Sequence, residues 1–121
     1  MRKLKLQVSI SLDGFIGGPA GEMDWMTMAW SEDLNSYVAE LIAPVDTIVL
    51  GRKLAEGFIP YWAGVAADKT NPEQGGGITF TNTPKVVFSK TMEPAAAAEK
   101  GWPNTVISNN DLVQEVQRIK G

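Results

Sequence analysis

The chain of 121 residues contains no cysteine and no histidine. Without cysteine it has no disulfide, thiolate nucleophile or sulfur ligand for zinc, and without histidine it lacks the usual general base and the commonest metal ligand. These absences exclude serine–histidine and cysteine–histidine catalysis, and we expect no metal site. No apolar run approaches the ~20 residues of a membrane span, and no signal-peptide core follows the start. We therefore expect a cytoplasmic protein with no membrane partner.

Basic residues are also few. Eleven lysines and arginines against 14 acidic residues give a net charge of −3 and a pI near 4.9. A net acidic chain has no general surface for a polyanion, so we expect no nucleic-acid partner. The composition, 44% hydrophobic and 21% charged, is typical of globular proteins. At this length it predicts a single domain covering residues 1–121.

The N-terminal third predicts one strand, one loop and one helix. Apolar residues occupy every second position of Lys3–Ser11, which predicts a half-buried strand. A turn at Asp13-Gly14 and a glycine-rich, flexible loop follow. Apolar residues spaced i, i+3, i+4, i+7 and i+8 then predict a helix with Ser31 as its N-cap, stopped by Pro44.

Three short apolar runs predict buried parallel strands: Thr47–Leu50, Lys85–Ser89 and Thr105–Ser108. The first leads into a short helical stretch that Gly57 and Pro60 are expected to end. The segment Trp62–Pro84, which contains three consecutive glycines, is expected to be a mobile loop.

Two helical segments are predicted in the C-terminal part: a turn at Ala95–Ala98 and a final helix capped by Asp111. Short apolar strands that alternate with helices predict an α/β fold with a mainly parallel sheet and flanking helices. In such sheets, ligands bind at the carboxyl ends of the strands.

Cations and hydroxyls stand at two of these strand ends. Gly51-Arg52-Lys53 places two cations where a helix begins, an arrangement that suits a phosphate. Ser89-Lys90 adds a hydroxyl and a cation at the end of the next predicted strand. A solvated turn with two surface cations is an equally valid interpretation of Gly51-Arg52-Lys53 taken alone.

The carboxylates are concentrated elsewhere. Seven of them, and no lysine or arginine, lie between Lys5 and Arg52. Asp33 and Tyr37 are four residues apart on one predicted helix face, where they could bind and stack on a flat ring; Trp25 is a candidate wall of that site. The alternative makes Asp33 an ordinary first-turn acid and Tyr37 a core residue.

The order of these segments resembles the dihydrofolate reductase-like fold, and most closely the bacterial proteins related to the reductase domain of the riboflavin-biosynthesis deaminase–reductase. The residues that carry the resemblance lie in five segments across most of the chain. They are Ser9–Ile16, Asp24-Trp25 with the helix entered at Asp33, Thr47–Lys53, Pro60–Trp62 and Val86–Lys90.

This resemblance implies hydride transfer from NADPH to a heterocyclic or sugar-derived substrate, pterin-like or of the ribosylaminopyrimidine type. Hydride donation is the cofactor's chemistry, so the missing histidine and cysteine are no obstacle. The implied site residues fall into three groups. The catalytic residue would be Asp33; the substrate-binding residues would be Asp13, Trp25 and Tyr37; and the cofactor-binding residues would be Ile16, Gly17, Gly51, Arg52, Lys53, Ser89 and Lys90.

Two departures from the family pattern leave an alternative open. Leu54 stands where the family usually has a hydroxyl residue, and the family's C-terminal strands and paired-glycine loop do not follow Gly121. We therefore expect a domain that lacks the usual C-terminal strands and forms a homodimer over its sheet edge. The alternative function is a non-catalytic nucleotide-binding or dimerisation remnant of the same fold.

Overall fold

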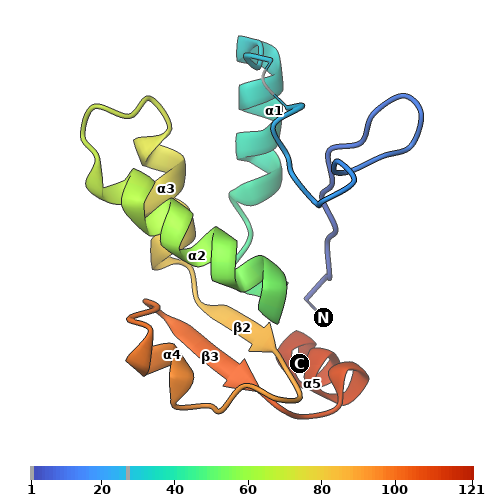
Figure 1. The fold of residues 1–121 in the computed structure, drawn as a ribbon, viewed down its shortest axis with the longest axis vertical. Helices are drawn as coiled ribbons and strands as arrows, with labels where there is room; N and C mark the ends of the chain where they lie inside the picture. The colour runs from blue at the N-terminus through green and yellow to red at the C-terminus, as the bar shows by residue number, and fades with distance from the viewer. Residues whose placement is uncertain (1, 27) are drawn as a thin grey trace. The chain divides into compact units, whose positions relative to one another are not determined.

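A computed structural model describes residues 2–26 and 28–121 (Figure 1). In chain order, the elements of these residues are α1 (Glu32–Ile42), β1 (Ile48–Gly51), α2 (Arg52–Ala67), α3 (Gln74–Asn82), β2 (Lys85–Phe88), α4 (Ala96–Glu99), β3 (Thr105–Ser108) and α5 (Leu112–Lys120). The chain divides into two compact units. One contains the residues up to Pro44 with Lys120–Gly121, and the other is Val45–Ile119.

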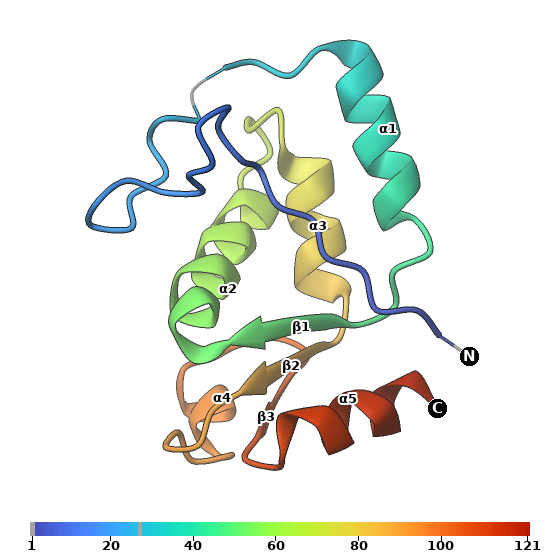
Figure 2. The same cartoon turned by 90° about the vertical axis from the view of Figure 1, so that its right-hand side faces the viewer.

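The sheet of the larger unit is parallel, in the order β1-β2-β3 (Figure 2). Gly51 pairs with Phe88, and Phe88 pairs with Ser108, so the three strands end side by side. Each strand lies within one residue of its predicted bounds, and helices connect the strands as parallel pairing requires. The predicted α/β fold class, a parallel sheet with flanking helices, is confirmed.

One hydrophobic cluster holds this unit together. The central side chain of the sheet, Val87, is fully buried between Leu50 of β1 and Ile107 of β3 in the core cluster. Ala55 and Ile59 of α2 bury their side chains in the same cluster. The core therefore fixes the start of α2 against the sheet, which positions the carboxyl end of β1.

Helix α2 is longer than the sequence predicts. It continues through Gly57 and Pro60 to Ala67, so the prediction that these two residues end it is wrong. An interior proline costs a helix ~3 kcal/mol, and Pro60 is exposed. The helix nevertheless persists because it buries Ile59 before the proline and Val65 after it. Tertiary packing outweighs the local signal.

The prediction of a mobile loop over residues 62–84 is also wrong. The end of α2 and all of α3 lie there, and the three glycines form the first turns of α3. Trp62 and Phe80 pack with their ring centroids 4.9 Å apart, which joins the two helices. A Cβ on Gly77 would lie 2.7 Å from the Ala66 nitrogen, so the glycine lets the helices approach closely.

Lys85 connects α3 to the sheet. Its side chain is only 2% exposed, and its Nζ donates hydrogen bonds to the carbonyls of Thr81 (3.0 Å) and Thr83 (2.9 Å). These carbonyls lie at the C-terminal end of α3, where a cation is favourable. Burial lowers the pKa of Lys85. The residue thus caps α3 from within the first position of β2.

The predicted strand Lys3–Ser11 does not form: the described residues before β1 contain no strand. Alternation defines an apolar face, but a strand also needs a neighbour for its backbone hydrogen bonds. The apolar side chains of the segment, Leu4, Leu6, Val8 and Ile10, are between 49% and 89% exposed. The predicted helix is confirmed as α1, which buries none of its side chains.

Candidate functional site

The carboxyl ends of the three strands form one edge of the sheet, which we call the strand-end edge. It consists of the residues that close each strand or follow it: Gly51-Arg52-Lys53, Ser89-Lys90 and Ser108-Asn109-Asn110. Because Gly51, Phe88 and Ser108 are in register, the structure brings the predicted cofactor residues of β1 and β2 to this same edge. Ligands of open parallel sheets bind at such edges.

At the end of β1, two cations start a 16-residue helix. Gly51 is its extended N-cap, and a Cβ there would meet nothing within 4 Å. The Arg52 guanidinium is 3.0 Å from the Glu56 carboxylate, with 40% of the Arg52 side chain exposed. Lys53 is exposed. Free backbone N–H groups at a helix N-terminus and cations beside them favour an anion.

At the end of β2, Ser89 and Lys90 are held by the loop that follows β3. The Ser89 Oγ accepts the Met92 N–H at 2.9 Å. The Lys90 Nζ donates to the Asn110 carbonyl at 3.3 Å and to the Asn109 carbonyl at 3.5 Å. A hollow of about 150 Å³ lies here, lined by Phe88, Ser89, Lys90, Asn110 and Leu112. The two predicted residues therefore share one small cavity.

Asn109 and Asn110 also belong to this edge, and they are not among the residues predicted from the sequence. The Asn109 side-chain amide donates to the carbonyls of Ser89 (2.6 Å) and Met92 (2.9 Å), so it ties the loop after β2 to the loop after β3. The signal was present, since Asn109-Asn110 follows its strand just as Ser89-Lys90 does. Applying the strand-end rule to all three strands would have found it.

Asn110 is positioned by a buried carboxylate. Its side-chain amide donates to Glu115 Oε2 at 3.2 Å, and Arg118 donates to Glu115 Oε1 at 2.6 Å. The hydrogen bond from Arg118 contributes most to lowering the pKa of Glu115, and the hydrogen bond from Asn110 contributes next. Glu115 is the buried residue of α5, whereas the apolar Leu112 and Val113 are more than half exposed. The ionised form of Glu115 thus orders the loop at the edge.

This arrangement predicts acid-sensitive stability. Because folding lowers the pKa of Glu115, the unfolded chain binds more protons around the ordinary glutamate pKa, and the stabilisation is lost as pH falls through the folded pKa. Urea unfolding at a series of pH values measures this effect. Below the ordinary glutamate pKa, the free energy of unfolding should fall more steeply with decreasing pH in wild type than in Glu115→Gln. Parallel curves for the two proteins would contradict this role.

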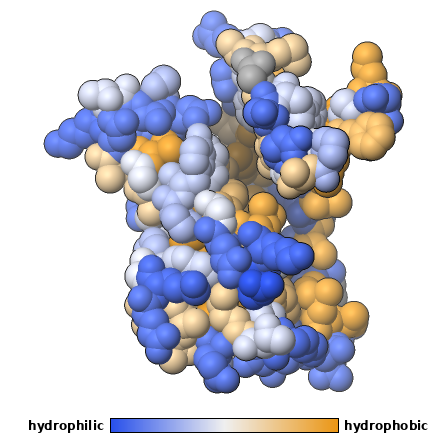
Figure 3. Space-filling view, in the orientation of Figure 1, coloured by the Kyte–Doolittle hydropathy of each residue, from blue (hydrophilic) through white to orange (hydrophobic). Residues whose placement is uncertain are grey.

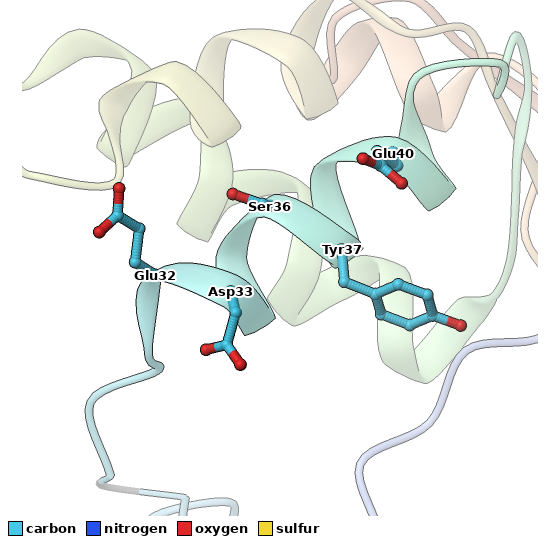
Figure 4. A pocket seen from close by; sticks show the side chains of 5 residues that line it. All are labelled: Glu32, Asp33, Ser36, Tyr37 and Glu40. Atoms are coloured by element: carbon cyan, nitrogen blue, oxygen red, sulfur yellow. The ribbon is translucent and has the colours of Figure 1, made fainter.

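The remaining predicted residues belong to the N-terminal unit, where Asp33 and Tyr37 line a hollow on α1. Its lining residues all come from α1, and Asp33 and Tyr37 project on the same side of the helix in Figure 4. Tyr37 is 59% exposed, so its ring is not a core residue. A carboxylate and an exposed aromatic ring therefore lie on one surface of α1, and their role in binding a flat ligand stays a prediction.

Asp33 is a carboxylate rather than a proton donor at neutral pH. Its hydrogen bond with the Ser31 side chain contributes most to lowering its pKa, and a hydrogen bond with the Leu34 backbone contributes next. An ionised carboxylate accepts hydrogen bonds from ring N–H groups. The chemistry available to Asp33 is thus orientation of a ligand and stabilisation of positive charge.

The other predicted residues lie in or next to the loop between Ser11 and α1. The Asp13 carboxylate accepts the Ser11 hydroxyl at 2.5 Å, and Trp25 is 37% exposed. The Gly18 N–H donates to the Glu22 carbonyl at 2.8 Å, which closes a turn beside Ile16 and Gly17. None of the four lines the α1 hollow. The structure therefore places Asp33 and Tyr37 together in the N-terminal unit, and Arg52, Ser89 and Lys90 together in the other unit.

The described residues contain no cluster of three or more acidic side chains placed to hold a metal ion. The helices of residues 2–26 and 28–121 include none that is long and apolar enough to cross a membrane.

A parallel sheet whose strand ends carry a helix N-terminus, cations and hydroxyl and amide groups defines an α/β protein whose strand-end edge has groups of the kind that suit an anion. The sequence model of the RibD C-terminal domain matches residues 2–119, so the chain belongs to the RibD C-terminal domain family, which has a dihydrofolate reductase-like fold. The predicted family is thereby confirmed.

Two relatives are uncharacterized proteins of Bacillus subtilis (strain 168). YyaP is 28% identical over 120 residues, which cover 98% of this chain and 57% of YyaP. YwjB is 38% identical over 131 aligned residues, which cover 97% of this chain and 70% of YwjB. The chain thus spans little more than half of YyaP. Comparison with solved structures gave no significant match.

Proposed function

We propose that the protein is a cytoplasmic, NADPH-dependent reductase that transfers a hydride to a pterin-like or ribosylaminopyrimidine-type substrate. The observation that carries the proposal is the strand-end edge. There, Arg52, Lys53 and Lys90 gather at the carboxyl ends of neighbouring parallel strands in a chain of the RibD C-terminal domain family. Proteins of this dihydrofolate reductase-like family usually bind NADPH.

The chemistry of the edge fits the phosphates of this cofactor. The N-terminus of α2 offers backbone N–H groups, and Arg52 can pair with two phosphate oxygens through its planar guanidinium. Ser89 and Lys90 provide a hydroxyl and a cation for the 2′-phosphate that distinguishes NADPH from NADH. Open space at Gly51 leaves room for a phosphate near the helix start. When bound, NADPH supplies the hydride.

The N-terminal unit would supply the substrate side. Asp33, ionised at neutral pH, would accept hydrogen bonds from ring N–H groups, and Tyr37 and Trp25 would stack on the ring. Asp13 would orient the ring edge, and the main chain at Ile16 and Gly17 would lie beside the nicotinamide. These groups hold two rings in position, which is the main task of a protein in hydride transfer.

Asp33→Asn tests the substrate side. The variant keeps the size of the side chain but loses its charge. A hydrogen bond to a charged group is worth about 1.5–3 kcal/mol, so turnover of a dihydropterin or a ribosylaminopyrimidine should fall about 10- to 100-fold. NADPH affinity should be unchanged. Oxidation of NADPH, followed by its absorbance, measures turnover, and Glu93→Gln, an exposed acid in the other unit, is the control. Equal rates for Asp33→Asn and wild type would overturn this role.

The second candidate function is a non-catalytic nucleotide-binding or dimerisation module. Leu54 favours it, because this residue stands in the first turn of α2 with 57% of its surface exposed and contributes no hydroxyl to a phosphate. If the protein binds NADPH but no heterocycle that is tested leads to oxidation of the NADPH, the result would support the non-catalytic module. Turnover would exclude it.

A further inference from the structure

A single side chain bridges the loop that carries Lys90. This loop follows β2, and we call it the 89–92 loop. The Asn109 amide donates to the Ser89 carbonyl (2.6 Å), where the loop begins, and to the Met92 carbonyl (2.9 Å), where it ends. Inside the loop, the Met92 N–H donates to the Ser89 Oγ at 2.9 Å. The backbone on both sides of Lys90 is therefore held by one residue of the neighbouring loop.

The loop after β3, which supplies Asn109, is itself anchored. The Asn110 N–H donates to the Oγ of buried Ser108 at 3.3 Å, and the Asn110 side chain donates to buried Glu115 of α5 at 3.2 Å. Hydrogen bonds to buried groups restrict a loop, because breaking them leaves those groups unpaired. The loop after β3 is therefore a fixed frame, and Asn109 extends this frame to the 89–92 loop.

The 89–92 loop presents a cation whose charge is not compensated. The Lys90 Nζ donates to the carbonyls of Asn109 (3.5 Å) and Asn110 (3.3 Å), which are neutral acceptors. Within the part of the chain that the structure describes, no carboxylate forms an ion pair with Lys90, whereas Arg52 is paired with Glu56. The charge of Lys90 is thus held in place and remains available to an anionic group of a ligand.

The hollow beside Lys90 combines polar and apolar groups. Leu112 of α5 contributes apolar surface, and Ser89 and Lys90 contribute a hydroxyl and a cation. Figure 3 shows a similar mixture on the surface, with hydrophobic residues in orange beside hydrophilic ones in blue at the lower right, where Figure 1 places α5. The Ser89 Oγ accepts the hydrogen bond from Met92, so its own proton can be donated. Both polar groups of the hollow thus suit a phosphate, and both belong to the loop that Asn109 holds.

We propose that Asn109 is a positioning residue for nucleotide selectivity: its amide fixes the 89–92 loop so that Lys90 and Ser89 meet the 2′-phosphate of NADPH. This inference rests on the proposed function. The Asn109 amide donates to two backbone carbonyls, so it acts on the ligand through Lys90 and Ser89. Without these two hydrogen bonds, binding of the phosphate would first have to order the loop, which weakens binding.

Hydrogen exchange followed by NMR, without nucleotide, tests the contact itself. In Asn109→Ala, the amides of Thr91 and Met92, which form hydrogen bonds within the loop, should exchange ~10-fold faster than in wild type or more.

The matched control is Asn104→Ala, at the opposite end of β3. The Asn104 side-chain amide also donates to a backbone carbonyl, that of Thr81 at 3.1 Å. Its φ of 52° disfavours alanine, so this variant loses a similar hydrogen bond and adds backbone strain. Exchange of the Thr91 and Met92 amides should nevertheless be unchanged in it.

Titration calorimetry at fixed salt tests the role in selectivity. Asn109→Ala should raise the dissociation constant of NADPH about 10-fold and that of NADH less than about threefold, because NADH lacks the phosphate. Asn104→Ala should change neither by more than about twofold. In a Lys90→Met background, Asn109→Ala should change NADPH affinity less than about threefold, since the cation that it positions is already absent.

Three results would overturn the inference while the proposed function stands. They are unchanged exchange of the loop amides in Asn109→Ala, an equal loss of affinity for NADPH and NADH, and an undiminished effect of Asn109→Ala in the Lys90→Met background. A wild type that does not prefer NADPH would contradict the proposed function and with it the role in selectivity. Faster loop exchange in Asn109→Ala would still support the contact between the two loops in that case.

Discussion

Gly77→Ala is expected to lower the free energy of unfolding by about 2 kcal/mol or more, because the new methyl group has no room between α2 and α3. Its Cβ would lie 2.7 Å from the Ala66 nitrogen, 2.9 Å from Val65 Cγ1 and 3.1 Å from the Trp62 carbonyl oxygen. Two of these three atoms are backbone, so relief requires the helices to separate. That separation would also loosen the contact between Trp62 and Phe80.

Gly75→Ala is the matched control on the same helix. A Cβ there meets nothing within 4 Å, so the substitution should leave stability unchanged or raise it by about 0.5–1 kcal/mol through helix propensity. Urea unfolding of the two variants beside wild type makes the comparison. Equal stabilities for Gly77→Ala and Gly75→Ala would contradict the close helix packing.

Arg52→Ala should weaken NADPH binding about 10- to 100-fold. A hydrogen bond to a charged group is worth about 1.5–3 kcal/mol, and each 1.4 kcal/mol is tenfold in affinity. Arg52 also pairs with Glu56, so removing the guanidinium leaves an uncompensated carboxylate near the phosphate position. Titration calorimetry at fixed salt measures the change.

Lys69→Ala removes one cation from an exposed position after α2 and serves as the control for net charge. It should change the NADPH dissociation constant less than about twofold, since exposed charges more than a Debye length apart are screened. Similar losses for Lys69→Ala and Arg52→Ala would mean that binding responds to net charge and not to the strand-end edge.

The parallel sheet could be predicted because the local composition of its strands is typical of buried β-strands. Val86-Val87 and Val106-Ile107 are β-branched runs, and they form strands wherever helices can cover them. The helical hairpin could not be predicted, because Pro60 and the glycines at 75–77 are breakers by local rules. Only the burial of Ile59 and Val65 and the fit at Gly77 reverse that outcome, and both depend on tertiary contacts.

One part of the candidate site could likewise be predicted from the sequence, and another part could not. Arg52, Ser89 and Lys90 could be placed together from the sequence, since the carboxyl ends of parallel strands share one edge. Asp33 and Tyr37 could be paired by helical spacing. What spacing cannot give is the relation between these two groups, because it depends on the irregular loop between Ser11 and α1. The strand predicted at Lys3–Ser11 failed for a related reason, since alternation specifies a face and not a partner.

Binding of NADPH to the purified chain, with NADH as the comparison, tests the central claim most directly. Titration calorimetry at fixed salt should show micromolar binding of NADPH and at least about tenfold weaker binding of NADH, because the 2′-phosphate adds charge-assisted hydrogen bonds at Ser89 and Lys90. Absence of NADPH binding by the folded protein, or equal affinity for the two nucleotides, would contradict the account.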